Sequence, residues 1–230
     1  MKPIMPALLL LATASPAAAG ERSYSVTDFD RVQVDGPYEV VLTTGSSSKA
    51  RASGSQLALD AVTVEVSGGV LRVHANRSAW GGYPGQTVEP AKVFASTRDL
   101  KAATVRGAGS LSIDRARGLR VDLALAGNGR LTVAAMAADQ LNVGLIGAGR
   151  ISLAGAAKQM RATIQGSGDL DAAALKVQDA TLDADTAGNV AFEAQRTAKV
   201  KAAGAGDVTI TGSASCTIQS EGSGRLRCGR

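Results

Sequence analysis

The sequence LAGNGRLTV, residues 125–133, recurs twenty residues later as LIGAGRISL, residues 145–153. In both copies a glycine pair precedes one polar residue, and apolar residues then alternate with polar ones, which is the period of a β-strand. This Gly-x-Gly pattern occurs six times, and residues 186–188 form a seventh, degenerate copy. The pairs are Gly107 and Gly109, Gly127 and Gly129, Gly147 and Gly149, Gly166 and Gly168, Gly204 and Gly206, and Gly222 and Gly224.

Successive copies start 18 to 20 residues apart, a period that is typical of solenoid proteins. One period holds two short strands and cannot bury its own apolar side chains, but stacked periods can. We therefore predict a right-handed parallel β-helix of about seven coils of ~20 residues over residues 96–230. The glycines are expected at its corners, where sharp turns often need positive φ. The alternative is a meander or sandwich in which the glycines close hairpins.

The preceding segment has a different composition. All six prolines lie at or before Pro90, and six of the seven aromatic residues lie before residue 95. Apolar alternation and turns at residues 36–37 and 67–69 predict short strands with hairpin turns over residues 20–95. We expect this N-terminal β region and the repeats to form one continuous domain, residues 29–228.

Residues 1–19 have the pattern of a secretory signal peptide, with Lys2, an apolar run and small residues at 17–19. No later stretch approaches the ~20 apolar residues of a membrane-spanning helix. We therefore expect an exported protein, located in a periplasm or outside the cell.

The composition excludes several kinds of chemistry. A single histidine and two cysteines cannot build a multi-histidine or cysteine-rich metal site. Basic runs interleaved with aromatic residues, the signature of nucleic-acid binding, are absent. The glycine pairs lead into strands rather than into the helix that nucleotide binding needs, so no cofactor is expected. His74 is predicted to lie on the surface, because it alternates with Val73.

Cys216 and Cys228 lie in the final period and share the strand parity of inward-pointing residues. Export permits oxidation, so we predict a disulfide that closes the last coil. Two buried free thiols are the alternative.

Two sets of residues are candidates for binding. Trp80 and Tyr83, on a Gly- and Pro-rich loop, either bind a ligand such as a sugar ring or fold over one end of the rod as a cap. Arg130 and Arg150 belong to a column of residues that follow successive corners. They either hold an anion or an acidic sugar, or form part of a solvated face.

The residues FDRV at 29–32, GPYEVVL at 36–42 and the recurring Gly-Ala-Gly or Gly-Ser-Gly before Leu-x-Ile resemble a bacterial family, the autotransporter adhesin head GIN domain. The resemblance covers residues 29–228. It implies an exported β-helical domain, and it carries no catalytic residues.

From the residues we predict an exported, non-catalytic β-helical module that binds an envelope protein or a glycan, with a second copy of the chain as another candidate partner. One alternative is an enzyme that acts on polysaccharides, such as a lyase or hydrolase, because parallel β-helices host such enzymes. Its acids would be Asp183 with Asp185, or Asp169 with Asp171. An envelope assembly protein is the third hypothesis.

Overall fold

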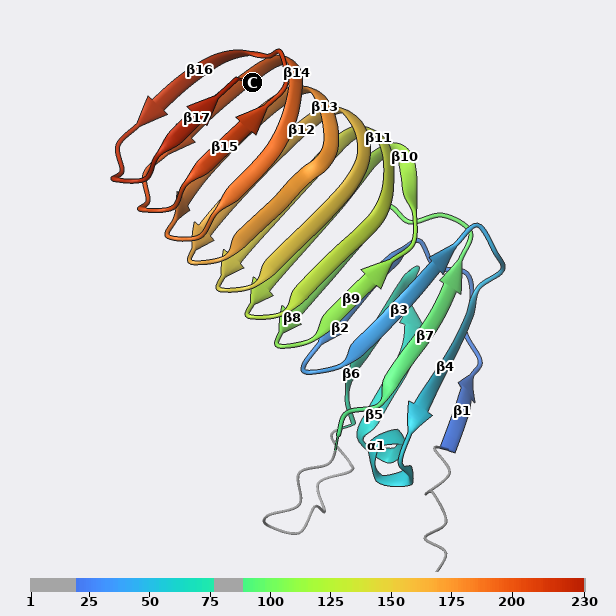
Figure 1. Cartoon of the computed structure of the whole chain (residues 1–230). Helices are drawn as coiled ribbons and strands as arrows, with labels where there is room; N and C mark the ends of the chain where they lie inside the picture. The colour runs from blue at the N-terminus through green and yellow to red at the C-terminus, as the bar shows by residue number, and fades with distance from the viewer. Residues whose placement is uncertain (1–19, 77–88, 230) are drawn as a thin grey trace, which may run out of the picture.

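The computed structural model describes residues 20–76 and 89–229 of the chain. These residues form a right-handed parallel β-helix of about six turns, with additional strands at its N-terminal end (Figure 1). The prediction of about seven coils was too high by one. The last glycine pair leads only into the three-residue strand β17 (Leu226–Cys228), which does not complete a coil.

Each coil has a tight corner at a glycine pair and a broad bend at the opposite edge, where several strands continue without a break (Figure 1). Strands of the repeat pair only in parallel within the described chain, so the hairpin alternative is wrong for this segment. The repeat strands are β8 (Ala102–Gly107), β9 (Ser110–Ile113), β10 (Ala116–Gly127), β11 (Arg130–Gly147), β12 (Arg150–Gly166), β13 (Asp169–Thr186), β14 (Val190–Ala202), β15 (Val208–Thr211), β16 (Ser215–Ser220) and β17.

The glycine corners stack backbone directly on backbone. Gly127 has a φ of +119°, and a Cβ there would come within 2.6 Å of the Gly107 carbonyl oxygen. Gly129 lacks a positive φ, yet a Cβ would collide with the carbonyl oxygen of Gly109. The predicted need for positive φ therefore holds for only some of these positions, and close approach of the next coil explains the rest.

The N-terminal region belongs to the same stack. Strands β2 (Arg31–Asp35) and β3 (Glu39–Thr44) form one coil, which lies between β6 (Val70–Ala75) with β7 (Lys92–Thr97) on one side and β8 with β9 on the other. The turn at Gly36 is therefore another corner, with its N–H donated to the Arg106 carbonyl at 2.9 Å. The expected hairpin turn at this position was wrong, because β2 and β3 each pair with other coils.

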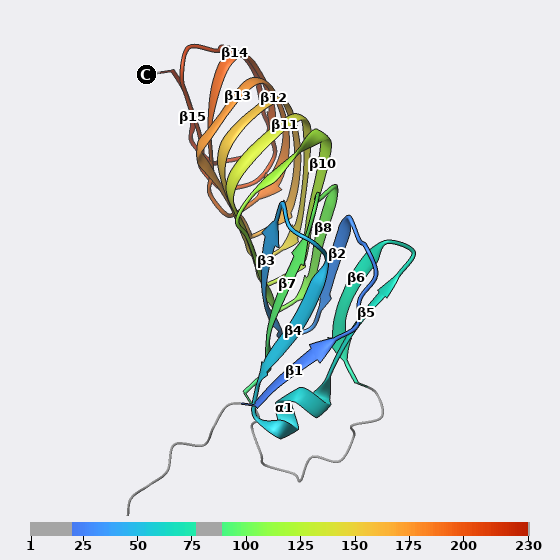
Figure 2. The same cartoon turned by 90° about the vertical axis from the view of Figure 1, so that its right-hand side faces the viewer.

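The second predicted turn does close a hairpin: β5 (Val62–Ser67) pairs antiparallel with β6. Two further antiparallel strands, β4 (Lys49–Gly54) and β1 (Gly20–Tyr24), extend the sheet from β7. The short helix α1 (Gln56–Ala61) lies at this end of the stack, away from the C-terminus (Figure 2).

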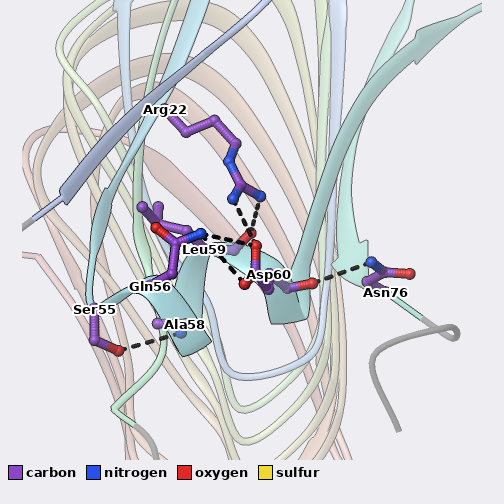
Figure 3. A network of polar contacts seen from close by, with 7 residues as sticks. All are labelled: Arg22, Ser55, Gln56, Ala58, Leu59, Asp60 and Asn76. Carbon is purple, nitrogen blue, oxygen red and sulfur yellow. Dashed lines mark hydrogen bonds and ion pairs between the residues drawn. The ribbon is translucent and has the colours of Figure 1, made fainter.

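Polar contacts hold α1 in place (Figure 3). Ser55 caps the helix by accepting the Ala58 N–H at 3.2 Å. Arg22 of β1 donates to the Leu59 carbonyl at 2.8 Å and to the Asp60 carboxylate at 2.6 Å, which lowers the pKa of Asp60. Because Ala58 and Leu59 are buried in the core, α1 closes the N-terminal end of the apolar interior.

Inward-pointing residues of successive coils form one continuous core from Phe29 to Ile210. Leu131, Ile151 and Leu170 are register partners on neighbouring coils and are all buried. At the C-terminal end a disulfide joins Cys216 on β16 to Cys228 on β17, with 6.6 Å between their Cα atoms. The predicted disulfide is thus confirmed. The expected inward position holds in part for Cys216, which is half-buried against the core, but is wrong for Cys228, which is exposed at the end of the stack.

Candidate functional site

The residues that follow the glycine corners form the predicted column on the outer surface. Ser110 lies opposite Arg130, Arg130 opposite Arg150, and Arg150 opposite Asp169 in the parallel register. Each is the first residue of its strand, and its side chain points outward because the following residue, such as Leu131, points into the core.

These residues line a shallow groove of about 420 Å³, which we call the corner groove. Its floor contains the backbone of Gly109, Gly129 and Gly149, where a Cβ would run into the neighbouring coil. The backbone N–H groups of Arg130 and Arg150 are used between coils, since they donate to the Gly109 and Gly129 carbonyls at 2.9 and 3.0 Å. A ligand in the corner groove would therefore meet side-chain donors rather than these amides.

The two predicted arginines differ in their surroundings. Arg150 Nη2 donates to Asp169 Oδ2 at 2.7 Å, and Asp169 Oδ1 also accepts the Asn189 N–H at 2.9 Å. The Asn189 N–H, followed by the Arg150 guanidinium, lowers the pKa of Asp169, and the carboxylate in turn raises the pKa of Arg150. Arg130 has no ion pair with any residue that the structure describes. The corner groove thus contains one neutralised and one uncompensated guanidinium.

Other predicted residues lie elsewhere. Trp80 and Tyr83 fall outside the described residues. His74 lies on the outer face of β6, where its Nε2 is 3.4 Å from Glu65 Oε1. This agrees with the predicted surface position.

A second outer surface was not predicted. The Phe94 ring points out of β7, with the Arg51 guanidinium carbon 4.4 Å from its centroid and the Lys92 ammonium 5.7 Å away. A hollow of about 420 Å³ lies beside it and includes Val41. In the sequence, the alternation of Val93 and Ala95 with Phe94 indicates that the Phe94 ring points outward. The residues around the ring come from three separate strands, so the sequence alone does not bring them together.

Residues 28–214 match the family described as "Putative auto-transporter adhesin, head GIN domain". The chain belongs to this family. None of the curated proteins matches the sequence.

Solved structures share the fold of this GIN domain. A protein of Bacteroides fragilis described as a putative adhesin has a TM-score of 0.81 and 18% identity, with 92% of this chain and 97% of that chain covered. A Parabacteroides distasonis protein described as a putative lipid binding protein has a TM-score of 0.73 and 18% identity, with coverage of 92% and 96%. A putative adhesin of the same species has a TM-score of 0.68 and 20% identity, with coverage of 91% and 96%.

The acid pairs of this GIN domain lie on two different outer surfaces. Asp183 and Asp185 are exposed on the long strand β13, and Asp183 lies opposite Lys201 of the next coil. Asp169, in contrast, is engaged in the corner groove. The described ranges contain no group of three or more His, Cys, Asp or Glu residues placed to bind a metal ion.

Proposed function

We propose that this chain is an exported, non-catalytic, adhesin-like module that binds an acidic glycan in the corner groove. The observation that carries the proposal is the uncompensated guanidinium of Arg130, which lies over a glycine floor between two other coils. A guanidinium can form two parallel hydrogen bonds to the carboxylate of an acidic sugar, and these are among the stronger polar contacts in proteins.

Neighbouring side chains can bind the rest of such a ligand. The Ser110 hydroxyl and the Asn128 amide line the corner groove and can donate to or accept from sugar hydroxyls. The coils repeat at ~4.8 Å, so an extended polymer along the groove would contact several coils in turn. Because each coil is fixed by its backbone pairing, the backbone of the site loses little entropy on binding.

Family membership supports a binding role, since the family is described as an adhesin head domain. The disulfide and the signal-like residues 1–19 support export, because disulfides persist in oxidising compartments. No helix among residues 20–76 and 89–229 has both the length and the apolar character required to cross a bilayer.

The electrostatics of Asp169 argue against its acting as the general acid of a glycoside hydrolase. A glycosidase needs a carboxylic acid with a raised pKa to protonate the leaving group. The pKa of Asp169 moves the other way, because the Asn189 N–H and then the Arg150 guanidinium lower it.

The test is an equilibrium titration with oligogalacturonate and with a neutral oligosaccharide of the same length. We expect binding of the acidic polymer alone, weakened about tenfold or more by Arg130→Gln, since charged hydrogen bonds contribute ~1.5–3 kcal/mol. The matched control is Arg161→Gln, which removes an exposed arginine of β12 that has no ion pair among the described residues.

Equal loss in the Arg130→Gln and Arg161→Gln variants would contradict the proposed site. The appearance of new sugar ends during the titration would contradict the non-catalytic assignment and favour the polysaccharide-acting enzyme.

A further inference from the structure

Three arginines surround a small pocket at the broad-bend edge, which is the edge opposite the glycine corners. Arg98 lies in the turn between β7 and β8, Arg115 in the turn between β9 and β10, and Arg117 on β10. They line one pocket of about 290 Å³, together with Asp99 and Thr44. Figure 1 shows the start of β10 at the bend, on the side of the stack away from the corners.

The positive charge of this pocket is largely uncompensated. Arg98, Arg115 and Arg117 form no ion pair with the described part of the chain. The lining carries three guanidiniums against the single carboxylate of Asp99, a formal charge of +2.

Asp114, which precedes Arg115 in the chain, forms its hydrogen bonds with neighbouring backbone groups. Its Oδ1 accepts the backbone N–H groups of Thr44 at 2.9 Å and of Arg115 at 2.6 Å. The three guanidiniums of this lining repel one another and outnumber its one carboxylate, so the arrangement is stabilised when an anion is bound.

An exposed leucine lies two residues after Arg117. Leu119 is 80% exposed, the highest fraction among the large apolar side chains that the structure describes. The register places it level with Asp139 and Lys158 of the next two coils, which form an ion pair of 2.8 Å. The coil that contains β10 thus presents an apolar side chain to solvent at the level where the next two coils present a salt bridge.

We propose that Arg98, Arg115, Arg117 and Leu119, here called the arginine edge, bind the surface of a membrane that contains anionic phospholipids. The guanidiniums would bind lipid phosphates, and Leu119 would insert among the acyl chains. Basic side chains beside an exposed apolar residue match the two layers of such a surface, because the headgroups are anionic and the interior is apolar. This goes beyond glycan binding: the arginine edge would hold the module on a membrane while the corner groove stays free.

The test is co-sedimentation of the full chain with vesicles of phosphatidylcholine alone or with 30% phosphatidylglycerol, at ~0.1 M salt. We expect binding to the anionic vesicles only. The triple variant Arg98→Gln, Arg115→Gln, Arg117→Gln should lower the partition coefficient at least about tenfold, because each basic residue near an anionic surface contributes.

The matched control removes three other cations with no ion pair among the described residues, Arg161→Gln, Lys199→Gln and Lys201→Gln, and so changes the net charge equally. Equal loss in both triple variants would overturn the proposal, since it would indicate attraction by net charge alone. Equal binding to both kinds of vesicle would overturn it as well. All proteins carry the same residues 1–19, so differences between them report the substitutions.

The apolar part is tested separately. Leu119→Ser should weaken vesicle binding several-fold, whereas Ile146→Ser, at a side chain 59% exposed on β11, should not. Inorganic phosphate should displace the protein from vesicles no more than sodium chloride of equal ionic strength. Stronger displacement by phosphate would assign the pocket to free phosphate and contradict the membrane proposal.

Membrane binding and the proposed glycan binding can be tested independently, because Arg130→Gln should leave vesicle binding unchanged. Melting temperature and oligogalacturonate binding of the triple arginine variant serve as the controls for folding.

Discussion

Arg150 and Asp169 are register partners on neighbouring coils, and the 2.7 Å ion pair between them fixes the charge pattern of the corner groove. One coil earlier, Arg130 faces Ser110 on one side and Arg150 on the other, and neither can neutralise it. In this part of the column Arg150 is therefore neutralised, whereas Arg130 has no ion pair with the residues that the structure describes.

This arrangement predicts that Asp169→Asn strengthens the binding of an acidic saccharide. The variant removes a negative charge from the groove and releases Arg150, while the amide oxygen can still accept the Asn189 N–H. We expect affinity to rise by about threefold to tenfold at low salt, with the gain shrinking as salt screens the charges. Isothermal titration of wild type and variant measures this, and weaker binding in the variant would count against the groove.

The stacked corners predict a strong penalty for a side chain at Gly127. Gly127→Ala combines an unfavourable φ of +119° with a Cβ 2.6 Å from the Gly107 carbonyl oxygen. We expect a loss of about 2–4 kcal/mol in the free energy of unfolding, measured by urea denaturation.

Two other glycines separate these causes. Gly45 has a φ of +84°, but no atom lies within 4 Å of the position that an alanine Cβ would occupy, so Gly45→Ala should cost only about 1–2 kcal/mol. Gly144 has no positive φ, and the nearest atom to an alanine Cβ would be the Leu123 carbonyl oxygen at an ordinary contact distance of 4.0 Å, so Gly144→Ala should stay within about 0.5 kcal/mol of wild type. Equal losses at Gly127 and Gly45 would argue against backbone stacking as the cause.

We expect reduction of the disulfide to destabilise the last coil locally rather than the whole fold. Cys216 and Cys228 enclose a separation of 12 residues, for which loop entropy gives about 3 kcal/mol. In a solenoid each coil contacts mainly its neighbours, so reduction should release the last coil while the others persist. Hydrogen exchange should accelerate in β16 and β17 and remain slow in β11 and β12. Acceleration throughout the chain would contradict this independence of the coils.

The surroundings of Asp179 predict that the folded state loses stability in acid. The Arg196 guanidinium, followed by the Thr197 hydroxyl at 2.7 Å, lowers its pKa to about 2 from 3.8. Because the pKa of Asp179 is lower in the folded state than in the unfolded chain, the ionised carboxylate stabilises the folded state when the pH is above the unfolded-state pKa. This contribution is lost as the pH falls from about 4 to about 2. Asp179→Asn should therefore lower the melting temperature at pH 7 but not at pH 2. A difference that persists unchanged at pH 2 would exclude this cause.

The repeat could be predicted from the sequence because its signals are local. Glycine spacing gives the coil length, and strand parity places Leu131 inward, Arg130 outward and the two cysteines together. The order of the N-terminal coils could not be predicted in this way. That β2 lies between β6 and β8 depends on pairing over long separations, which no local pattern encodes.

Other features could not be predicted from the sequence, each for a specific physical reason. Helix α1 contains Leu57 and Leu59 at alternate positions, which is also the pattern of a strand, and only Ser55 indicates a helix start. The arginine edge was not predicted because its three arginines come from two turns and a strand, and the fold alone brings them to one pocket. The salt bridge that distinguishes Arg150 from Arg130 likewise depends on the coil register.

The most direct measurement for glycan binding in the corner groove is an NMR titration of the protein with oligogalacturonate. We predict that the guanidinium signal of Arg130 and the amide signals around Gly129 shift together and saturate with one binding constant, and that in Arg130→Gln the Gly129 shifts need about tenfold more ligand or do not saturate. Saturating shifts confined to other surfaces, with the Arg130 signal unchanged, would contradict the account.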